Sequence, residues 1–302
     1  MRSYLGIDVG GTKVALRLEG AEGAAGGDPP RREAVFHWPG PGSVEADVRR
    51  LADQVRTLLA RWPAPPAAVG VALPAALDAE GRVTTWPNRP SWNGFPLARW
   101  ARGQLPDARV HFADDGDLAA LAEAAEAGCP DVVYLGVGTG VGGGCVLGGR
   151  SVPGSARGSS EVGHMLVDRS GPVCDCGRRG CLQAVASGPA TLRRAARRRG
   201  REVTYGELAA AVGHDEPWAR ETLAETCSAL GAAVVTLGEV LRPALAVVGG
   251  GFATGIPQLV PEVAARADEL RRTGVPIPEV RPAALDGLSS LAGALLLARR
   301  DG

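Results

Sequence analysis

The chain has 302 residues, which is enough for one large domain or two ordinary ones with real cores. It carries 33 basic and 33 acidic residues, and this balance argues against a nucleic-acid or membrane-surface partner. Aromatic residues make up only 4% of the chain, while its 43 glycines are about twice the average share. Aliphatic side chains must therefore fill the core.

The N-terminal sequence MRSYLGIDVGG lacks the apolar stretch of a signal peptide. No run of about 18 apolar residues predicts a membrane span. These features predict a cytoplasmic protein. The basic residues are almost all arginines, and Lys13 is the single lysine of the chain.

Hydrophobic patterning predicts alternating strands and helices. Strands are expected at 3–9, 14–18, 67–73, 131–135 and 244–248. Helices are expected from Val44 to Leu59 with Ser43 as N-cap, at 118–127, within 187–242 and at 288–300. Loops are expected at 19–30, 74–96 and 136–144. The pattern of a strand, a glycine turn and a second strand occurs twice, which indicates two related halves.

The first glycine loop follows a strand and contains groups that bind phosphate. Gly10 and Gly11 let backbone N–H groups approach an oxyanion, Thr12 adds a hydroxyl and Lys13 a cation. Asp8 just upstream fits a Mg²⁺ held through water. The alternative is an ordinary Gly-Gly hairpin turn. The loop is not a Walker A motif, because a strand follows it instead of a helix.

Two further glycine loops follow apolar strands. They contain Gly138, Thr139 and Gly140, and Gly249, Gly250 and Gly251. Each one could be structural, but three such loops together favour a nucleotide gripped from two sides. No G-x-G-x-x-G motif opens a helix with an acid about 20 residues later, so a dinucleotide-binding fold is disfavoured.

Three of the six cysteines, Cys174, Cys176 and Cys181, lie on one short glycine-punctuated stretch, and His164 precedes them. Cys₃His is a recognised closed ligand set for structural Zn²⁺. The alternatives are a redox pair or three buried thiols. A second cluster, the arginine-rich run 193–201, is interpreted as a solvated helical face and not as a polyanion site.

Three motifs together carry a family resemblance: D-V-G-G-T-K at 8–13, E-V-G-H at 161–164 and the C-x-C-G-x-x-G-C cluster. They resemble the ROK family of sugar kinases and repressors over nearly the whole chain. This resemblance implies an α/β fold of the two-domain hexokinase and actin type (ribonuclease H-like), with ATP and substrate in the cleft between the domains. The expected domains are 1–112 with 288–302, and 113–287 with the zinc loop.

The resemblance also assigns roles to residues. The stretch from Asp114 to Glu123 aligns with the family's N-D-A-N-A-A-A-L-G-E motif, so Asp115 is implied as the general base, or else these acids merely cap a helix. Asp8 is implied to associate with Mg²⁺, and the three glycine loops to bind ATP. The implied substrate-binding residues are Asn88, Asp114, Asp115, Glu161, His164 and Gln183, with His164 also a zinc ligand.

Three positions depart from the family pattern: Asp114 replaces Asn, Gln183 replaces Glu, and Ala75 replaces Gly. Asp114 exchanges an amide for an acceptor-only group, while Gln183 exchanges an acceptor for a group that also donates. A site that reads hydroxyls discriminates strongly against analogues that leave its groups unpaired. The nucleotide and catalytic motifs are intact, so a working kinase for a substrate other than plain glucose is expected.

The favoured hypothesis is an ATP-dependent kinase that phosphorylates a primary hydroxyl of a hexose or hexose-like polyol. The altered positions leave room for an amino sugar or a carbasugar cyclitol. A sugar-responsive repressor is disfavoured, because the phosphate loop begins almost at the first residue and no basic recognition helix precedes it. A ligand-binding protein without activity is disfavoured by the retained Asp8, Lys13 and Asp115. The family also implies a homodimer or homotetramer.

Overall fold

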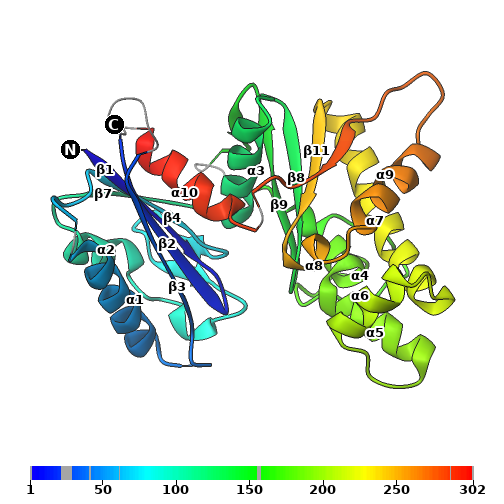
Figure 1. The fold of residues 1–302 in the computed structure, drawn as a ribbon, viewed down its shortest axis with the longest axis horizontal. Coiled ribbons are helices and arrows are strands. Elements are labelled where there is room, and N and C mark those ends of the chain that lie inside the picture. The colour runs from blue at the N-terminus through cyan, green and yellow to red at the C-terminus, as the bar shows by residue number, and fades with distance from the viewer. Residues whose placement is uncertain are drawn as a thin grey trace. The chain divides into compact units, whose positions relative to one another are not determined.

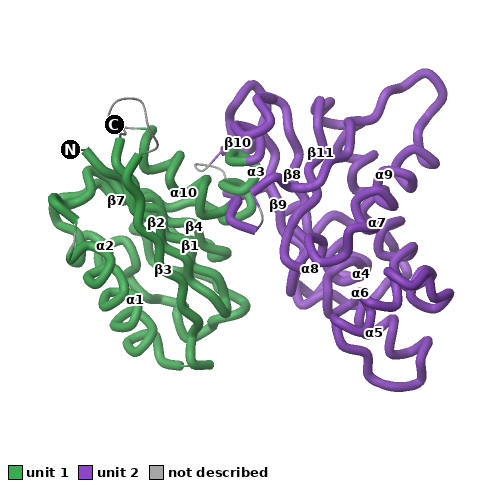
Figure 2. Tube along the Cα trace, in the orientation of Figure 1, with its two compact units in different colours: residues 1–122, 290–302 green, residues 123–289 purple. Residues whose placement is uncertain are grey.

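The computed structural model describes residues 2–21, 29–40, 42–60, 62–154, 158–285 and 287–300. The chain divides into two compact units (Figure 2): unit 1 is Met1–Ala122 with Ser290–Gly302, and unit 2 is Glu123–Ser289. The boundary predicted between residues 112 and 113 thus lies further along, inside the helix α3 (Asp115–Glu126). A continuous helix, and not a loop, carries the chain from one unit to the other. Much of the predicted loop at 19–30 lies outside the described residues.

Unit 1 is built on a five-stranded sheet with the order β3-β2-β1-β4-β7 (Figure 1). Its strands are β1 (Ser3–Val9), β2 (Lys13–Gly20), β3 (Arg31–His37), β4 (Ala68–Ala72) and β7 (Arg109–Ala113). β1 to β3 are antiparallel neighbours, whereas β1, β4 and β7 run parallel. The helices are α1 (Val44–Leu59), α2 (Leu97–Gln104) and α10 (Ser289–Arg299), and the short elements are β5 (Ala76–Leu77), β6 (Val83–Thr85) and a 3₁₀ turn at Pro90–Trp92.

Alternate side chains of β1 belong to different apolar clusters. Leu5 and Ile7 belong to the apolar cluster that contains the buried residues of α1. Tyr4 packs with Leu295 of α10. A Cβ at Gly70 of β4 would lie 1.9 Å from the carbonyl oxygen of Ala294, so glycine is required there for α10 to approach the sheet. The sheet of unit 1 is therefore covered on both faces.

Helix α1 begins where the sequence predicts. Ser43 caps it, because its hydroxyl accepts a hydrogen bond of 3.3 Å from the amide of Ala46. The residues Val48, Leu51, Val55 and Leu58 recur at helical spacing and are all buried. Asp47 in the first turn is buried with them, which the pattern does not predict.

Unit 2 repeats the strand arrangement of unit 1. Its sheet has the order β10-β9-β8-β11-β12, with β8 antiparallel to β9 and parallel to β11. The strands are β8 (Val132–Val137), β9 (Val141–Leu147), β10 (Arg150–Val152), β11 (Leu245–Gly249) and β12 (Glu279–Pro282). The helices are α4 (Leu182–Ala186), α5 (Gly188–Arg199), α6 (Tyr205–Gly213), α7 (Pro217–Leu241), α8 (Gly251–Thr254) and α9 (Leu259–Glu269), with a 3₁₀ turn at Val162–His164.

The glycine loop predicted at 136–144 is wrong in its extent. Gly136 pairs with Gly142 and Val137 with Val141, so only residues 138–140 form the turn. The remaining glycines lie in β8 and β9. A Cβ at Gly143 would lie 2.0 Å from the carbonyl oxygen of Tyr134, so close strand pairing accounts for at least one of these glycines.

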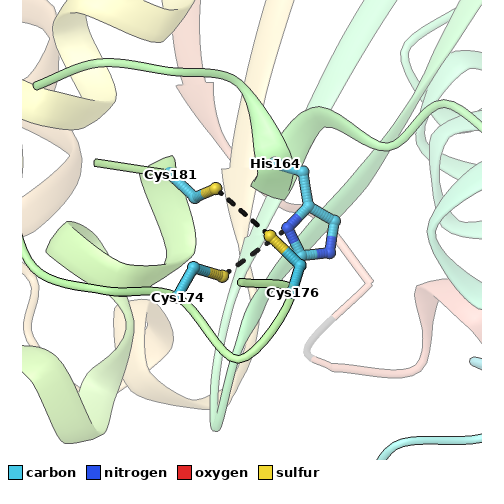
Figure 3. Close-up of side chains that lie close together, drawn as sticks. All are labelled: His164, Cys174, Cys176 and Cys181. Carbon is cyan, nitrogen blue, oxygen red and sulfur yellow. Dashed lines mark hydrogen bonds between the residues drawn. The ribbon is translucent and has the colours of Figure 1, made fainter. Parts of the chain in front are cut away.

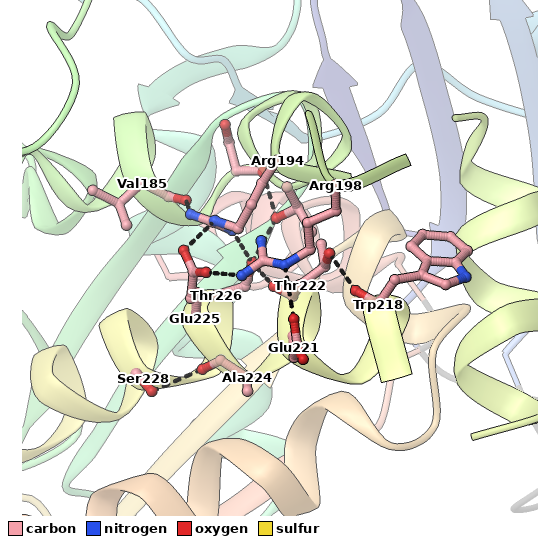
Figure 4. A network of polar contacts seen from close by, with 12 residues as sticks. Val185, Arg194, Arg198, Trp218, Glu221, Thr222, Ala224, Glu225, Thr226 and Ser228 are labelled. Carbon is pink, nitrogen blue, oxygen red and sulfur yellow. Dashed lines mark hydrogen bonds and ion pairs between the residues drawn. The ribbon is translucent and has the colours of Figure 1, made fainter. Parts of the chain in front are cut away.

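The predicted solvated face at 193–201 is also partly wrong (Figure 4). Arg194 on α5 is buried, and it contacts Glu225 at 2.8 Å and the hydroxyl of Thr226 at 2.8 Å on α7. Arg198 pairs with Glu221 and Glu225. These two arginines hold α5 and α7 together, because acidic side chains of α7 pair with them.

Helix α7 has the length and apolar composition of a membrane span, a property that no other described helix shares. Of its most apolar window, 56% is buried inside the protein. Residues such as Cys227, Leu230 and Val234 belong to the apolar core of unit 2. Helix α7 is therefore a core helix of unit 2.

Candidate active site and metal centre

The first glycine loop connects two paired strands of unit 1. Val9 of β1 pairs with Val14 of β2, so the four residues from Gly10 to Lys13 lie between them, and Lys13 is already the first residue of β2. The amide of Gly10 donates to the carbonyl of Lys13 at 2.9 Å and closes it. Asp8 is the last but one residue of β1, at the carboxyl end of a parallel strand, where ligands of α/β sheets bind.

The acids Asp114 and Asp115 follow the carboxyl end of β7. β1, β4 and β7 are parallel neighbours, so their carboxyl ends lie along one edge of the sheet. Asp114 caps α3, since its Oδ1 accepts hydrogen bonds from the amides of Gly116 at 3.0 Å and Asp117 at 3.2 Å. The helix then begins at Asp115, three residues before the predicted start at Leu118.

Asp8 and Asp115 influence each other's charge. Burial raises the pKa of Asp8 to about 6, partly offset by the positive charge of Lys13. Burial and, to a lesser extent, the charge of Asp8 raise the pKa of Asp115 to about 7. Two half-buried carboxylates with raised pKa values favour a cation nearby, and oxygen ligands of this kind suit Mg²⁺. The site is thus fit for a divalent cation and for a carboxylate that takes up a proton near neutral pH.

Asn88, the expected substrate residue of unit 1, lies against this loop. A Cβ placed on Gly11 would lie 3.0 Å from the Cβ of Asn88, so glycine at this position makes room for the asparagine. Asp8, the glycine loop, Asn88, Asp114 and Asp115 therefore all belong to unit 1.

Sequence reasoning missed the polar side chains beneath the loop. Trp38 donates its indole N–H to the carbonyl of Gly10, and Arg89 donates to the carbonyl of Gly11. Arg89 follows Asn88 directly, but its burial depends on a contact with Asp47, far away in the sequence. Periodicity carries no signal for a charged side chain that tertiary structure buries.

In unit 2 the second and third glycine loops lie side by side. The amide of Gly138 donates to the carbonyl of Gly140 at 2.9 Å and closes the turn. Gly250 adopts a φ of +88°, and a Cβ there would lie 2.5 Å from the carbonyl oxygen of Val137. The turn also accepts the amide of Gly188, the first residue of α5, at the Gly138 carbonyl. These contacts bring the predicted ATP residues of unit 2 together.

The four predicted zinc ligands also converge in unit 2 (Figure 3). The ligand atoms of His164, Cys174, Cys176 and Cys181 all lie within 4.8 Å of one another. Cys176 Sγ is 3.6 Å from Cys181 Sγ, and Cys174 Sγ is 3.7 Å from His164 Nδ1. A tetrahedral Zn²⁺ with bonds of about 2.3 Å to sulfur holds such atoms roughly 3.8 Å apart. The donor set and its spacing fit zinc.

Local structure turns His164 toward the thiols. A Cβ at Gly163 would lie 1.8 Å from the carbonyl oxygen of Val141, so only glycine lets the 3₁₀ turn pack on β9. His164 Nδ1 faces Cys174, while Nε2 lies 4.0 Å from the carboxylate of Glu161. Glu161 is exposed and accepts a hydrogen bond of 2.8 Å from Ser159. The imidazole thus links the metal side to the predicted substrate carboxylate.

The thiols of this cluster differ in their acidity. Hydrogen bonds from Arg178, first from its backbone N–H, lower the pKa of Cys176 to about 6. Burial raises the pKa of Cys181 to about 12. A thiolate is the metal-binding form, so a bound cation would stabilise the charge that burial disfavours at Cys181.

Gln183 lies between the zinc cluster and the second glycine loop. Its Nε2 is 3.8 Å from Cys174 Sγ, and a Cβ on Gly140 would lie 3.0 Å from its Oε1. An amide can donate to a thiolate, which the family's glutamate cannot do. This contact explains physically how glutamine is accommodated beside the cysteines.

Comparisons with known proteins identify this architecture. The model of the ROK family matches residues 4–301. A kanosamine kinase from Amycolatopsis mediterranei is 50% identical over 296 residues, covering 98% of this chain and 95% of that protein.

Two solved structures show the same fold. The ROK hexokinase of Thermus thermophilus superimposes with a TM-score of 0.84 at 30% identity, over 99% of this chain and 100% of that one. A ROK glucokinase from Streptomyces griseus, in complex with glucose and AMPPNP, gives a TM-score of 0.80 at 26% identity, over 99% of each chain. The predicted hexokinase-type α/β fold is confirmed. The chain belongs to the ROK family.

Proposed function

We propose that this protein transfers phosphate from ATP to the primary hydroxyl of an amino hexose, and that kanosamine is its substrate. The reaction class is that of its relatives: the protein is an ATP-dependent sugar kinase. The 50% identity to a kanosamine kinase over nearly the full length of both chains is the observation that carries the substrate assignment.

Asp114 supports a cationic substrate. It places a carboxylate beside Asp115 where the family pattern has a neutral amide, and the exposed Glu161 adds a second predicted substrate carboxylate in unit 2. An amino sugar carries an ammonium group where glucose carries a hydroxyl. Hydrogen bonds between ionised partners are roughly twice as strong as neutral ones, so acids favour such a substrate.

The residues of unit 1 perform the chemistry in this proposal. Asp115 takes the proton of the sugar hydroxyl as the hydroxyl oxygen bonds to the γ-phosphorus of ATP, and the bond to the β–γ bridging oxygen breaks to release ADP. Backbone N–H groups of the glycine loop and Lys13 hold the phosphates. Asp8 would hold Mg²⁺, which would supply positive charge to offset that of the phosphates.

The residues of unit 2 hold nucleotide and sugar. The turn at 138–140 and the glycines 249–251 contact ATP, while Glu161, His164 and Gln183 orient the sugar. His164, Cys174, Cys176 and Cys181 would hold a structural zinc, which would fix the loop that carries these groups; with four protein ligands the metal would have no open position for chemistry. A cytoplasmic homodimer or homotetramer is part of the proposal, on the family resemblance alone.

A coupled assay of ADP release tests the substrate. Kanosamine is expected to give a higher kcat/KM than glucose, glucosamine or N-acetylmannosamine. Turnover of glucose equal to that of kanosamine would contradict the amino-sugar assignment, and no turnover of any sugar would contradict a kinase.

Asp114→Asn is the matched variant. Asparagine keeps an oxygen that caps α3 and removes only the charge. The kcat/KM for kanosamine should fall about tenfold, while that for glucose should change by less than about threefold. An equal fall in kcat/KM for both sugars would show that the charge of Asp114 does not bind the amino group.

A further inference from the structure

Two buried side chains hold the carbonyls of the first glycine loop. The indole N–H of Trp38 donates to the carbonyl oxygen of Gly10 at 2.9 Å. The guanidinium Nε of Arg89 donates to the carbonyl oxygen of Gly11 at 3.1 Å. Trp38 is 6% exposed and Arg89 is 5% exposed, so both donor side chains are buried.

These two bonds determine where the amides of the loop point. A peptide group is planar and trans, so the N–H of each residue points opposite to the carbonyl that precedes it. With the carbonyl of Gly10 directed at Trp38, the N–H of Gly11 is directed away from Trp38. With the carbonyl of Gly11 directed at Arg89, the N–H of Thr12 is directed away from Arg89. Two successive donors are thereby presented on the side opposite the core.

Arg89 is itself fixed from three sides. Its guanidinium pairs with Asp47 and donates to the carbonyl of Gly40 at 3.2 Å. It also lies over the ring of Trp38, 4.6 Å from the ring centre. Asp47 accepts a second hydrogen bond, of 2.9 Å, from the indole of Trp92. The Arg89 guanidinium therefore has little freedom to move, and it offers the carbonyl of Gly11 a hydrogen-bond donor in a fixed position.

A buried ion pair is a poor means of stabilising a fold, because desolvating two charges costs about as much as their attraction returns. It is a good means of fixing geometry, because removing one partner leaves the other charge unpaired. The pair Arg89 and Asp47 has both partners at or below 5% exposure and ends on a functional loop. Precise orientation accounts for this arrangement better than stability does.

We propose that Trp38 and Arg89, with Asp47 behind them, are positioning residues that aim the amides of Gly11 and Thr12 at the phosphates of ATP. The inference rests on the proposed function, since it takes the loop as the phosphate site. Asn88 directly precedes Arg89 in the chain and lies close to Gly11. The arrangement ties the expected sugar contact in unit 1 to the phosphate loop.

The decisive variant is Trp38→Phe, which removes the indole N–H and keeps an aromatic ring against Arg89. Trp62→Phe is the matched control, because the indole N–H of Trp62 is buried without a hydrogen-bond partner among the described residues. Arg89→Lys keeps the positive charge but cannot reach Gly11, Gly40 and Asp47 together. Arg56→Lys, in the exposed pair with Asp53, is its control.

Nucleotide affinity is measured by calorimetry with Mg²⁺ and no sugar, using AMPPNP and AMP. Trp38→Phe should weaken AMPPNP about tenfold and Arg89→Lys more, since misplaced donors lose most of their effect. AMP, which lacks the β- and γ-phosphates, should change by less than about twofold in both. The controls should match the wild type. The KM for ATP should rise in parallel with the loss of AMPPNP affinity.

Two results would overturn the proposal: folded Trp38→Phe that binds AMPPNP as tightly as the wild type, or equal losses for AMP and AMPPNP. Circular dichroism establishes that each variant is folded. If Arg89→Lys does not fold, Trp38→Phe decides alone, because it leaves the ion pair intact. No sugar enters the experiment, so a wrong substrate assignment cannot be mistaken for failure of this inference.

Discussion

Burial raises the pKa values of Asp8 and Asp115 above that of an ordinary aspartate, and the charge of Asp8 raises the pKa of Asp115 further. Such shifts cluster where chemistry occurs, so the raised pKa values support the proposal that this edge of the unit 1 sheet is the active site. The motif predicts these two residues from local sequence. The shift itself depends on the parallel pairing of β1, β4 and β7, which brings distant residues to one edge.

Replacing Asp115 by Asn should lower kcat about 10² to 10⁴-fold, because the hydroxyl proton loses its acceptor. The same variant should be more stable than the wild type near pH 8, by about 1 to 3 kcal/mol of unfolding free energy, since it removes a disfavoured charge. ADP release and urea unfolding measure the two effects. Glu126→Gln, an exposed position on the same helix, is the control, and wild-type turnover by Asp115→Asn would refute the assignment as base.

The stability gain has a definite pH dependence. An unfolded aspartate has a pKa of about 3.9, so between about pH 4 and pH 7 the folded protein binds more protons at Asp115 than the unfolded chain does. The free energy of unfolding contributed by this group therefore falls as pH rises through that window. The difference between variant and wild type should vanish below pH 4.

The reaction rate should follow the same group. With glucose as substrate, which has no amino group to titrate, kcat/KM should rise with pH through a midpoint near 7 as Asp115 loses its proton. Higher Mg²⁺ concentrations should move the midpoint down, because a cation beside Asp8 favours the ionised form. A flat profile between pH 5 and pH 8 would contradict this role.

At the scale of elements, the zinc loop shows what sequence can reveal. Three cysteines on one short loop are held close together by the chain itself, so the motif correctly predicts that these side chains converge. The orientation of His164 depends in addition on the packing of a 3₁₀ turn against β9. Spacing alone does not reveal this contact.

Purified wild-type protein should contain about one zinc per chain by elemental analysis. Cys176→Ser should lose most of it, because a closed four-ligand site becomes incomplete. Cys129→Ser, which removes a cysteine outside the cluster, should keep it. Equal zinc content in the two variants would show that the cluster does not hold the metal.

Helix α3 carries a second element-scale feature in Glu123, which is 2% exposed. Its carboxylate accepts hydrogen bonds from the amides of Ala284 at 2.9 Å and Leu285 at 3.3 Å, and from the hydroxyl of Ser289 at 2.6 Å. Glu123 and Ser289 flank the two points where the chain passes between the units. The contact joins residues 166 apart in sequence, which no local pattern predicts.

Glu123→Ala should lower the free energy of unfolding by about 2 to 4 kcal/mol, since three donors lose a charged acceptor. Urea denaturation provides the measurement. Glu126→Ala, three residues later and exposed, should change it by less than about 0.5 kcal/mol. Similar stabilities for the two variants would show that the buried bonds contribute little.

At the scale of the whole molecule, two sheets of equal strand order and direction form the framework. The recurring strand and glycine turn indicates this repetition in the sequence, because the turn is a local feature. The unit boundary is displaced from the prediction because α3 runs through it without a break in its helical pattern. Helices α2 and α9 are missing from the predicted elements: α2 has only eight residues, and α9 buries Leu259, Val263 and Ala267 at a helical spacing that the prediction does not use.

The arginine bias of the chain has a chemical consequence at its one exception. Lys13 is half-buried at the start of β2 and carries the only side-chain amine of the sequence, since the arginines are guanidinium groups, which acylating reagents leave unmodified. An amine-specific ester therefore has a single side-chain target in the whole protein. Mass spectrometry should find one acylated side chain, at Lys13, and AMPPNP should slow the acylation. Equal labelling with and without AMPPNP would show that Lys13 does not lie at the phosphate site. A reporter group can thus be attached to the phosphate loop of this enzyme without any engineering of the sequence.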